Sequence, residues 1–251
     1  MKNALLLLVM LAGLLTACED KHKEPDPAMM GFGYYPLEIG DYRIYQVTDI
    51  SYKNDVGDTA RFQLRERIDT SFTDQTNELV YKVVRSVRPD EGSPWVDDSV
   101  YVVSKTSKML LLTKNNTKFV KLVFPVKEGK TWLGDAYNDR KALSYEPDPS
   151  KRSDYYLGKD PYTYENRGAS FTVNGETYGN TVTVVQGVPT ESWIGLDDRK
   201  EVYAEGVGMV YRLYKRIVYC NETESSGCDY AIGFKLYGNE RTEELISQGK
   251  E

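Results

Sequence analysis

The sequence predicts an all-β protein, and three observations lead to that class. Apolar residues alternate with polar ones in several separate runs, for example at Leu79, Tyr81 and Val83, and this period of two is typical of strands with one buried face. Residues that favour tight turns, such as Asn115-Asn116 and Asn174-Gly175, separate the runs. Twenty tyrosines against seven phenylalanines suit a large antiparallel sheet, where one end of a half-buried ring stays wet.

Taken in order, the alternating runs predict strands joined by hairpins. They cover residues 79–83, 120–124, 209–219 and 232–236, with a further turn signal at residues 55–58. The last segment, residues 239–248, allows two interpretations. It is either one short C-terminal helix, with Asn239 as its N-cap and Glu243 and Glu244 in its first turns, or a final strand.

The first 18 residues have the layout of an export signal. Lys2 is followed by an apolar run over residues 4–15, which is shorter than the roughly 20 residues that span a bilayer. The run ends in Leu15-Thr16-Ala17-Cys18, which resembles the lipobox of bacterial lipoproteins. That resemblance implies cleavage before Cys18 and lipidation of its sulfur. It therefore implies a signal peptide over residues 1–17.

Residues 18–33 are charged and contain Pro25 and Pro27, so we expect a flexible tether between lipidated Cys18 and one β-rich domain over residues 34–251. The membrane partner is then reached through the acyl chains, at the outer membrane. Glu19-Asp20 resembles the acidic export signals of surface lipoproteins, while Lys21 and Lys23 interrupt the match. Both the periplasmic face and the cell surface remain open.

The other two cysteines are expected to form a disulfide. Cys220 and Cys228 remain once Cys18 is lipidated, and an exported chain meets an oxidising compartment. Closing so short a loop is worth about 2.5 kcal/mol in the chain-entropy picture. A redox dithiol is the weaker alternative, because the two cysteines lack the Cys-x-x-Cys spacing.

Two segments repeat a Pro-aliphatic-x-x-Gly pattern just before an aromatic residue. They are Tyr35–Tyr42 and Phe124–Trp132, and a late Gly206-Val207-Gly208 precedes another aliphatic run. Each proline and glycine pair predicts a turn that leads into a strand. The chain resembles, in these motifs, uncharacterised β-rich envelope lipoproteins of Gram-negative bacteria. This resemblance implies a strongly curved antiparallel sheet, a half-barrel like that of lipoprotein carriers or a lipocalin-like barrel, and it implies no activity.

Composition argues against most familiar activities. The only histidine, His22, lies in the tether, so the domain lacks the imidazole base of a Ser-His-Asp or Cys-His site, and we expect no metal and no cofactor. A net charge of −6 without a basic block disfavours nucleic acid. Carboxylates are the remaining catalytic candidates, and no spacing singles out a pair. They are Asp97-Asp98, Glu165, Glu176, Asp197-Asp198 and Glu201.

An irregular segment from Asp135 to Gly168 is the candidate contact surface. It contains three prolines and six tyrosines, and long loops in compact domains are often functional. Exposed tyrosines would suit sugar faces or a protein partner, whereas the alternative is that they only cover the open end of the sheet. The candidate ligand-binding residues are Tyr145, Tyr155, Tyr156, Tyr162 and Tyr164.

Three functions follow from these observations. The leading expectation is a lipid-anchored, non-enzymatic envelope protein that binds either an apolar, lipid-like ligand within the curved sheet or another envelope component. The first alternative is a surface glycan-binding or assembly accessory lipoprotein that uses the tyrosine-rich loop. The second alternative is a glycoside hydrolase that uses two carboxylates.

Overall fold

The computed structural model describes residues 27–138, 160–220, 228 and 233–251, and the predicted all-β class is confirmed. Its thirteen antiparallel strands form one sheet. The elements are α2 (Pro27–Met30), η1 (Phe32–Tyr34), β1 (Asp41–Lys53), β2 (Val56–Thr73), β3 (Leu79–Arg88), β4 (Val96–Lys105), β5 (Met109–Lys114), β6 (Thr117–Val123), β7 (Thr131–Leu133), β8 (Pro161–Val173), β9 (Glu176–Gln186), β10 (Thr190–Ser192), β11 (Gly195–Ala204), β12 (Gly208–Tyr219) and β13 (Lys235–Lys250).

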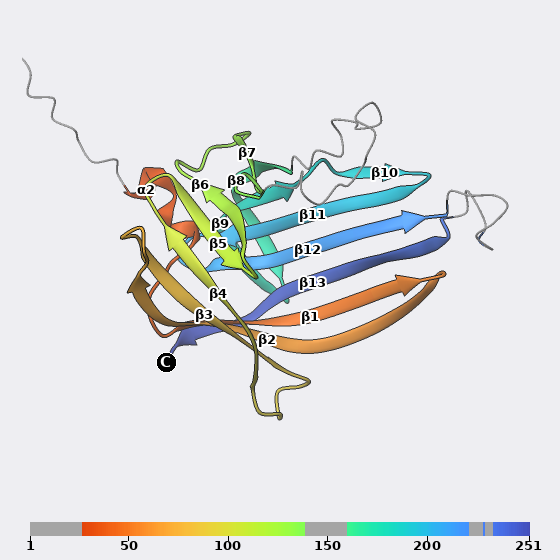
Figure 1. Cartoon of the computed structure of the whole chain (residues 1–251), viewed down its shortest axis with the longest axis horizontal. Helices are drawn as coiled ribbons and strands as arrows, with labels where there is room; N and C mark the ends of the chain where they lie inside the picture. The colour runs from red at the N-terminus through yellow and green to blue at the C-terminus, as the bar shows by residue number, and fades with distance from the viewer. Residues whose placement is uncertain (1–26, 139–159, 221–227, 229–232) are drawn as a thin grey trace, which may run out of the picture.

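The sheet curves strongly, as expected, and forms a nearly closed barrel (Figure 1). Its strand order is β6-β5-β4-β3-β2-β1-β13-β12-β11-β9-β8-β7, with β10 pairing the start of β11. Most neighbours are joined by hairpins, and the long-range pairing of β1 with β13 connects the two halves. The two ends of this order, β6 and β7, are consecutive in the chain and come together where the barrel closes (Figure 1).

Individual hydrogen bonds, rather than a full ladder, close the barrel between β6 and the pair β7–β8. The Val120 N–H donates to the Gly134 carbonyl over 2.8 Å, and the Trp132 indole N–H donates to the Val120 carbonyl over 2.9 Å. The Tyr164 hydroxyl accepts from the Val123 N–H over 2.8 Å and donates to the Val123 carbonyl over 2.9 Å. These contacts satisfy backbone groups of β6 that would otherwise form an open edge.

The domain starts earlier than the predicted tether boundary at residue 33. Phe32 packs edge-on against Phe124 with ring centroids 4.7 Å apart, and Tyr34 is 2% exposed. The Lys105 ammonium donates to the carbonyls of Phe32 and Tyr35 over 2.7 and 2.8 Å. The end of the predicted tether is therefore part of the folded domain, because Phe32 packs on Phe124 and Met30 packs against the core. Cys18 and the first part of the tether lie outside the described residues.

The C-terminal segment is a strand, so the helix considered for residues 239–248 is wrong. β13 pairs β1 on one side and β12 on the other. A strand in this position completes two hydrogen-bonded ladders, whereas a helix there would leave both neighbours with open edges. The glutamates of this segment have a high helix propensity, but the pairing with two neighbouring strands outweighs it.

The predicted turns at residues 115–116 and 174–175 are confirmed in the structure, whereas the one at residues 55–58 is displaced, because β2 already begins at Val56. Asn115 and Asn116 both have positive φ, 49° and 61°, and Asn174 and Gly175 have φ of 50° and 80°. The first hairpin turn lies at Asn54-Asp55, one residue before the predicted segment, with φ of 50° and 63°. Two positive φ angles match the right-handed twist of the flanking strands. The two Pro-Gly segments also end just before strands, β1 and β7.

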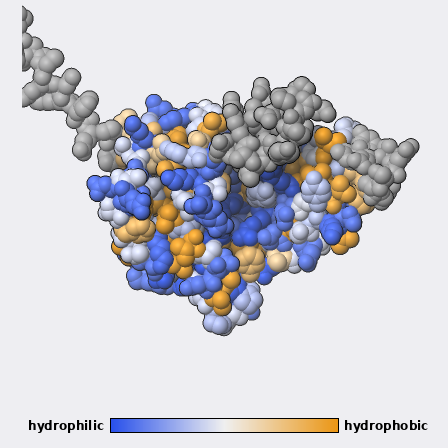
Figure 2. Space-filling view, viewed as in Figure 1, coloured by the Kyte–Doolittle hydropathy of each residue, from blue (hydrophilic) through white to orange (hydrophobic). Residues whose placement is uncertain are grey.

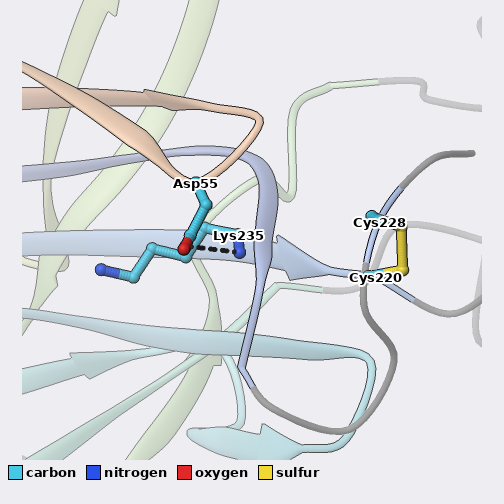
Figure 3. The surroundings of a disulfide bond; sticks show 4 residues. All are labelled: Asp55, Cys220, Cys228 and Lys235. Atoms are coloured by element: carbon cyan, nitrogen blue, oxygen red, sulfur yellow. Dashed lines mark hydrogen bonds between the residues drawn. A yellow bond between two sulfur atoms is a disulfide. The ribbon is translucent and has the colours of Figure 1, made fainter.

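The predicted disulfide between Cys220 and Cys228 is confirmed, with a Cα–Cα distance of 6.0 Å (Figure 3). It lies just after β12, near the start of β13. There the Asp55 carboxylate accepts the Lys235 backbone N–H over 3.1 Å, and the Asp55 N–H donates to the Lys235 carbonyl over 2.7 Å. The first hairpin is thus hydrogen-bonded to the start of β13. Among the described residues no helix has the length and apolarity needed to cross a bilayer.

Candidate functional site

The tyrosine-rich segment does not present the exposed rings that the sequence suggested. Tyr162 and Tyr164 are 4% and 0% exposed, because both point from β8 into the barrel. Trp132 packs on both rings, with centroids 5.9 and 4.4 Å away. The expectation of a contact surface is therefore corrected for these two residues, which belong to the core. Tyr145, Tyr155 and Tyr156 lie outside the described residues.

The inner face of the sheet, which faces the barrel interior, is crossed by a series of ion pairs. The Lys121 ammonium on β6 lies 2.5 Å from the Glu201 carboxylate on β11, although the two strands are not neighbours in the sheet. Glu201 also accepts from Arg212 Nε over 2.9 Å and from the Tyr203 hydroxyl over 2.5 Å. Glu201 is 2% exposed, so its charge is compensated by partners instead of water.

The series continues across the middle of the sheet through Glu243 on β13, which is 1% exposed. Its carboxylate accepts from Arg212 over 2.7 Å and from Arg241 over 2.8 Å, and the Arg85 guanidinium lies 3.8 Å away. Outer members extend the pairing to β1 and β2. We call the set the inner charge network, and its members are Asp49, Glu66, Arg85, Lys121, Glu201, Arg212, Arg241 and Glu243.

The ion pairs keep the two most deeply buried carboxylates, Glu201 and Glu243, ionised. Burial alone would raise the pKa of Glu201. The charges of Lys121 and Arg212 and the hydrogen bonds to Glu201 outweigh burial and lower the pKa to about 2. Burial likewise opposes ionisation of Glu243, while the arginines around it lower its pKa below the ordinary value. The inner face is therefore a paired, charged layer at neutral pH.

Side chains fill the interior near this network. The space between Tyr35, Tyr101, Lys121 and Arg212 measures about 10 Å³, which is room for about one water molecule. A drug-sized or lipid-sized ligand needs roughly 300 Å³ or more. The apolar cavity expected of a carrier is therefore not found among the described residues of the inner face. Opening one would separate buried ion pairs at large cost.

The opposite face of β11 borders an open groove of about 440 Å³, which we call the outer groove. Because successive residues of a strand point to opposite faces, Asp198, Lys200 and Val202 line the groove, while Arg199, Glu201 and Tyr203 point inward. The other walls come from β8, β9 and the segment after β9. The groove is lined by Glu165, Asn166, Ala169, Ser170, Phe171, Thr181, Thr183, Val185, Pro189, Asp198, Lys200 and Val202.

The groove exists because the β8–β9 hairpin leaves the sheet and curls over its outer face. β9 pairs β11 only from Lys200 to Ala204. Farther along the hairpin, Phe171 packs on Tyr211 of β12, with centroids 5.4 Å apart, and the Asn174 amide donates to the Leu245 carbonyl of β13 over 3.1 Å. The hairpin therefore crosses two strands beyond its pairing partner and leaves a space beneath it.

A bulge in β8 makes this bend. Residues 166–168 have no partner in the β8–β9 register, and Asn166 and Gly168 have positive φ. The Glu128 carboxylate, from the turn before β7, accepts the backbone N–H groups of Asn166 and Arg167 over 3.1 and 2.8 Å. Such a bulge redirects a strand, and here Glu128 holds it in one geometry.

Several polar groups of the groove are not engaged by the protein itself. Thr181 donates to the Ala169 carbonyl over 2.9 Å, whereas Thr183, which is 9% exposed, makes no side-chain hydrogen bond in the described part of the chain. Glu165, Asp198 and Lys200 form no ion pair with any described residue. Together with the Phe171 ring, they offer donors, acceptors and an apolar platform to a ligand.

The carboxylates considered at the sequence level separate into different environments. Glu201 is ion-paired within the inner charge network, and Asp97 accepts a hydrogen bond from the Ser86 hydroxyl over 2.7 Å. Glu165 and Asp198 line the outer groove. The sequence analysis did not predict the groove. The period of two shows which residues of a strand share a face, but it does not show what that face meets. The β8–β9 hairpin encloses the groove by curling over the sheet, and the only residue in the sequence that signals this bend is Gly168 in the bulge.

The fold and the groove define the class of protein: an all-β chain whose single curved sheet is filled on the inside and carries an open groove outside. No protein family matches the chain, and no curated protein matches it. Two solved structures are similar to it. One is a Bacteroides fragilis protein described as exported and as having a YmcC-like fold, with a TM-score of 0.37 and 9% identity, over 86% of this chain and 98% of that one.

The other is a Parabacteroides distasonis protein described as a lipoprotein. Its TM-score is 0.32 at 10% identity, and the similarity covers 86% of this chain and 98% of that one. At these scores neither structure carries a conclusion about what the present chain does.

Proposed function

We propose that this chain is a lipid-anchored, non-enzymatic binding protein of the bacterial envelope that holds a glycan in its outer groove. The observation that carries the proposal is a groove of about 440 Å³ whose polar side chains are largely unpaired with the protein itself. The inner face offers no comparable space in the described residues, so a ligand on the outside agrees better with the packing than one within the barrel.

The chemistry of the lining favours a hydroxyl-rich ligand. Ser170, Thr183 and Asn166 can donate and accept hydrogen bonds, and Asp198 can accept them from sugar hydroxyls. The Phe171 ring supplies an apolar face of the kind on which a sugar ring packs. A purely apolar ligand would leave these polar groups desolvated without partners, which is unfavourable.

The lipid anchor rests on the Leu15-Thr16-Ala17-Cys18 lipobox. Nine residues, 18–26, precede the described domain, and a fully extended chain of that length reaches roughly 30 Å. The domain would then stay close to the membrane. Replacing Cys18 with Ser should move the protein from the membrane fraction to the soluble fraction; continued membrane association would contradict the anchor.

Glycan binding is tested by titrating oligosaccharides into the protein and measuring heat by calorimetry. Phe171→Ala and Thr183→Val should each weaken binding about tenfold, because each removes one kind of contact in the groove. Phe72→Ala is the matched control, since this ring is 47% exposed on β2, outside the residues that line the groove. Equal effects of the control and groove variants would contradict the proposal.

The same titration decides between binding and hydrolysis, which remains an alternative because Glu165 and Asp198 both line the groove. A binding protein returns the oligosaccharide intact. Release of shorter sugars that is lost in Glu165→Gln or Asp198→Asn would instead make the protein a carboxylate-dependent glycosidase.

A further inference from the structure

The charges in the outer groove are unevenly balanced. Two carboxylates, Glu165 and Asp198, and one ammonium, Lys200, line it, and none of the three has an ion-pair partner in the described part of the chain. The lining therefore has a formal charge of −1, in a protein whose net charge is −6. Unpaired charges of this kind are available to a ligand, in contrast to the neutralised set of the inner charge network.

Strand register gives the order of these charges along the groove. Glu165 lies opposite Thr183, and Thr183 lies opposite Val202 on β11. Lys200 is two residues from Val202 on the same face, and Asp198 is two residues farther. Along the strand direction, Lys200 therefore stands between the two carboxylates. Asp198 lies toward one end of the groove, whereas Glu165 lies near its middle, because Thr181 and Phe171 line the groove beyond it.

Thr183 gives an independent indication that this space receives a ligand. This residue is 9% exposed, lines the groove and makes no side-chain hydrogen bond in the described part of the chain. Its neighbour on the same face, Thr181, satisfies its hydroxyl with the Ala169 carbonyl. The Thr183 oxygen is not among the enclosed polar atoms that lack a partner, so it is accessible from the groove, where water or a ligand can complete its hydrogen bonds. Thr183 lies directly beside Glu165 in the register.

We infer that the glycan recognised by the outer groove carries a positively charged amine, as amino sugars do. This inference rests on the proposed function. The amine pairs with Glu165 or Asp198, the Thr183 hydroxyl bonds to the adjacent sugar, and the Lys200 ammonium donates to an uncharged oxygen. Polyanionic glycans are disfavoured, because the two carboxylates of the groove outnumber its one ammonium and the protein as a whole is negative.

The test compares three oligosaccharide probes of the same length, titrated into the mature full chain in detergent. The first is an oligomer of glucosamine, the second its fully N-acetylated form, and the third an oligomer of a uronic acid. N-acetylation removes the charge and keeps the sugar backbone, so the first two probes isolate the role of the amine.

The inference predicts that the glucosamine oligomer binds about tenfold more tightly than the N-acetylated form at low salt, with the uronic acid oligomer weakest. Added salt should reduce this preference, since it screens the charges. Glu165→Gln together with Asp198→Asn should abolish the preference, so that the glucosamine and N-acetylated probes bind with equal affinity. Glu176→Gln is the control, because it removes one charge from the same hairpin outside the residues that line the groove.

The outcomes separate the two proposals. Equal affinity for the amine and N-acetyl probes, or tightest binding of the uronic acid probe, would overturn the inferred amine while leaving glycan binding intact. A preference that survives in the Glu165→Gln, Asp198→Asn variant would also overturn it. If no probe binds, the proposed function itself fails.

Discussion

The two faces of β11 use the same residue types for opposite purposes. Glu201 faces inward and is compensated by Lys121, Arg212 and the Tyr203 hydroxyl, whereas Asp198 faces the outer groove without an ion-pair partner among the described residues. The inner space measures about 10 Å³ and the outer groove about 440 Å³. Charges that are mutually satisfied and tightly enclosed make the loss of any one partner costly, while charges left unpaired beside an open space are free to recognise a ligand.

Replacing each carboxylate gives the strongest test of this comparison. Glu201→Ala leaves Lys121 and Arg212 without their shared partner, and a buried ion pair broken on one side costs about 3–5 kcal/mol. Asp198→Ala should change the free energy of unfolding by less than about 0.5 kcal/mol. Urea unfolding of the two variants measures both values. Similar losses would mean that the two faces do not differ as described.

Acid should unfold the protein through the inner face. The pKa of Glu201 is about 2 in the folded state against an ordinary 4.5, so its contribution is present above pH 4.5 and is lost as the pH falls toward 2. The shift corresponds to about 3 kcal/mol. Unfolding followed from pH 6 to pH 2 should show this loss, and the loss should shrink in Glu201→Gln. Asp198→Asn should leave it unchanged; an equal reduction would contradict the assignment.

The hydroxyl that closes the barrel gives a smaller expected effect. Tyr164→Phe removes both hydrogen bonds to Val123 and should lower the free energy of unfolding by about 1–2 kcal/mol. Tyr178→Phe on β9 is the control, because its hydroxyl makes no hydrogen bond in the described residues, and we expect a change below about 0.5 kcal/mol. Thermal unfolding monitored by circular dichroism compares them. A harmless Tyr164→Phe would show that the edge of β6 does not depend on this contact.

Two threonines of the groove give the smallest effects on stability. Thr181→Val loses the bond to the Ala169 carbonyl and should cost about 1 kcal/mol, whereas Thr183→Val should be close to neutral, because no protein partner is lost. Ligand binding should rank them in reverse, with Thr183→Val the more damaging. A marked loss of stability in Thr183→Val would indicate a structural role for this hydroxyl.

Several features were predictable because their signals are local. The period of two at residues 79–83 and 120–124 falls within β3 and at the β6 end, and the asparagine pairs adopt the positive φ angles that their turns require. The Cys220–Cys228 bridge also needs only a short loop. In each case the interacting residues are close in the chain, so tertiary context changes little.

The alternation pattern failed where the inner face is polar. Lys121, Glu201 and Glu243 have the sequence character of solvated surface residues, yet they are buried. Their partners are far away in the chain; Lys121 and Glu201, for example, are 80 residues apart. Tyr162 and Tyr164 were misjudged for the related reason that a tyrosine suits either a wet edge or a core with a partner for its hydroxyl.

By itself the sequence determined the β class, the positions of three strands (β3, β6 and β12) and of two hairpin turns, and the disulfide, because these depend on neighbouring residues and on backbone chemistry. Only the tertiary structure decided that residues 239–248 form a strand, since the pairing of β13 with β1 and β12 replaces local helix propensity with two ladders. It also decided which face of β11 is closed and which is open. A period of two identifies residues on a common face, but the curvature of the sheet and the curl of one hairpin determine what that face meets.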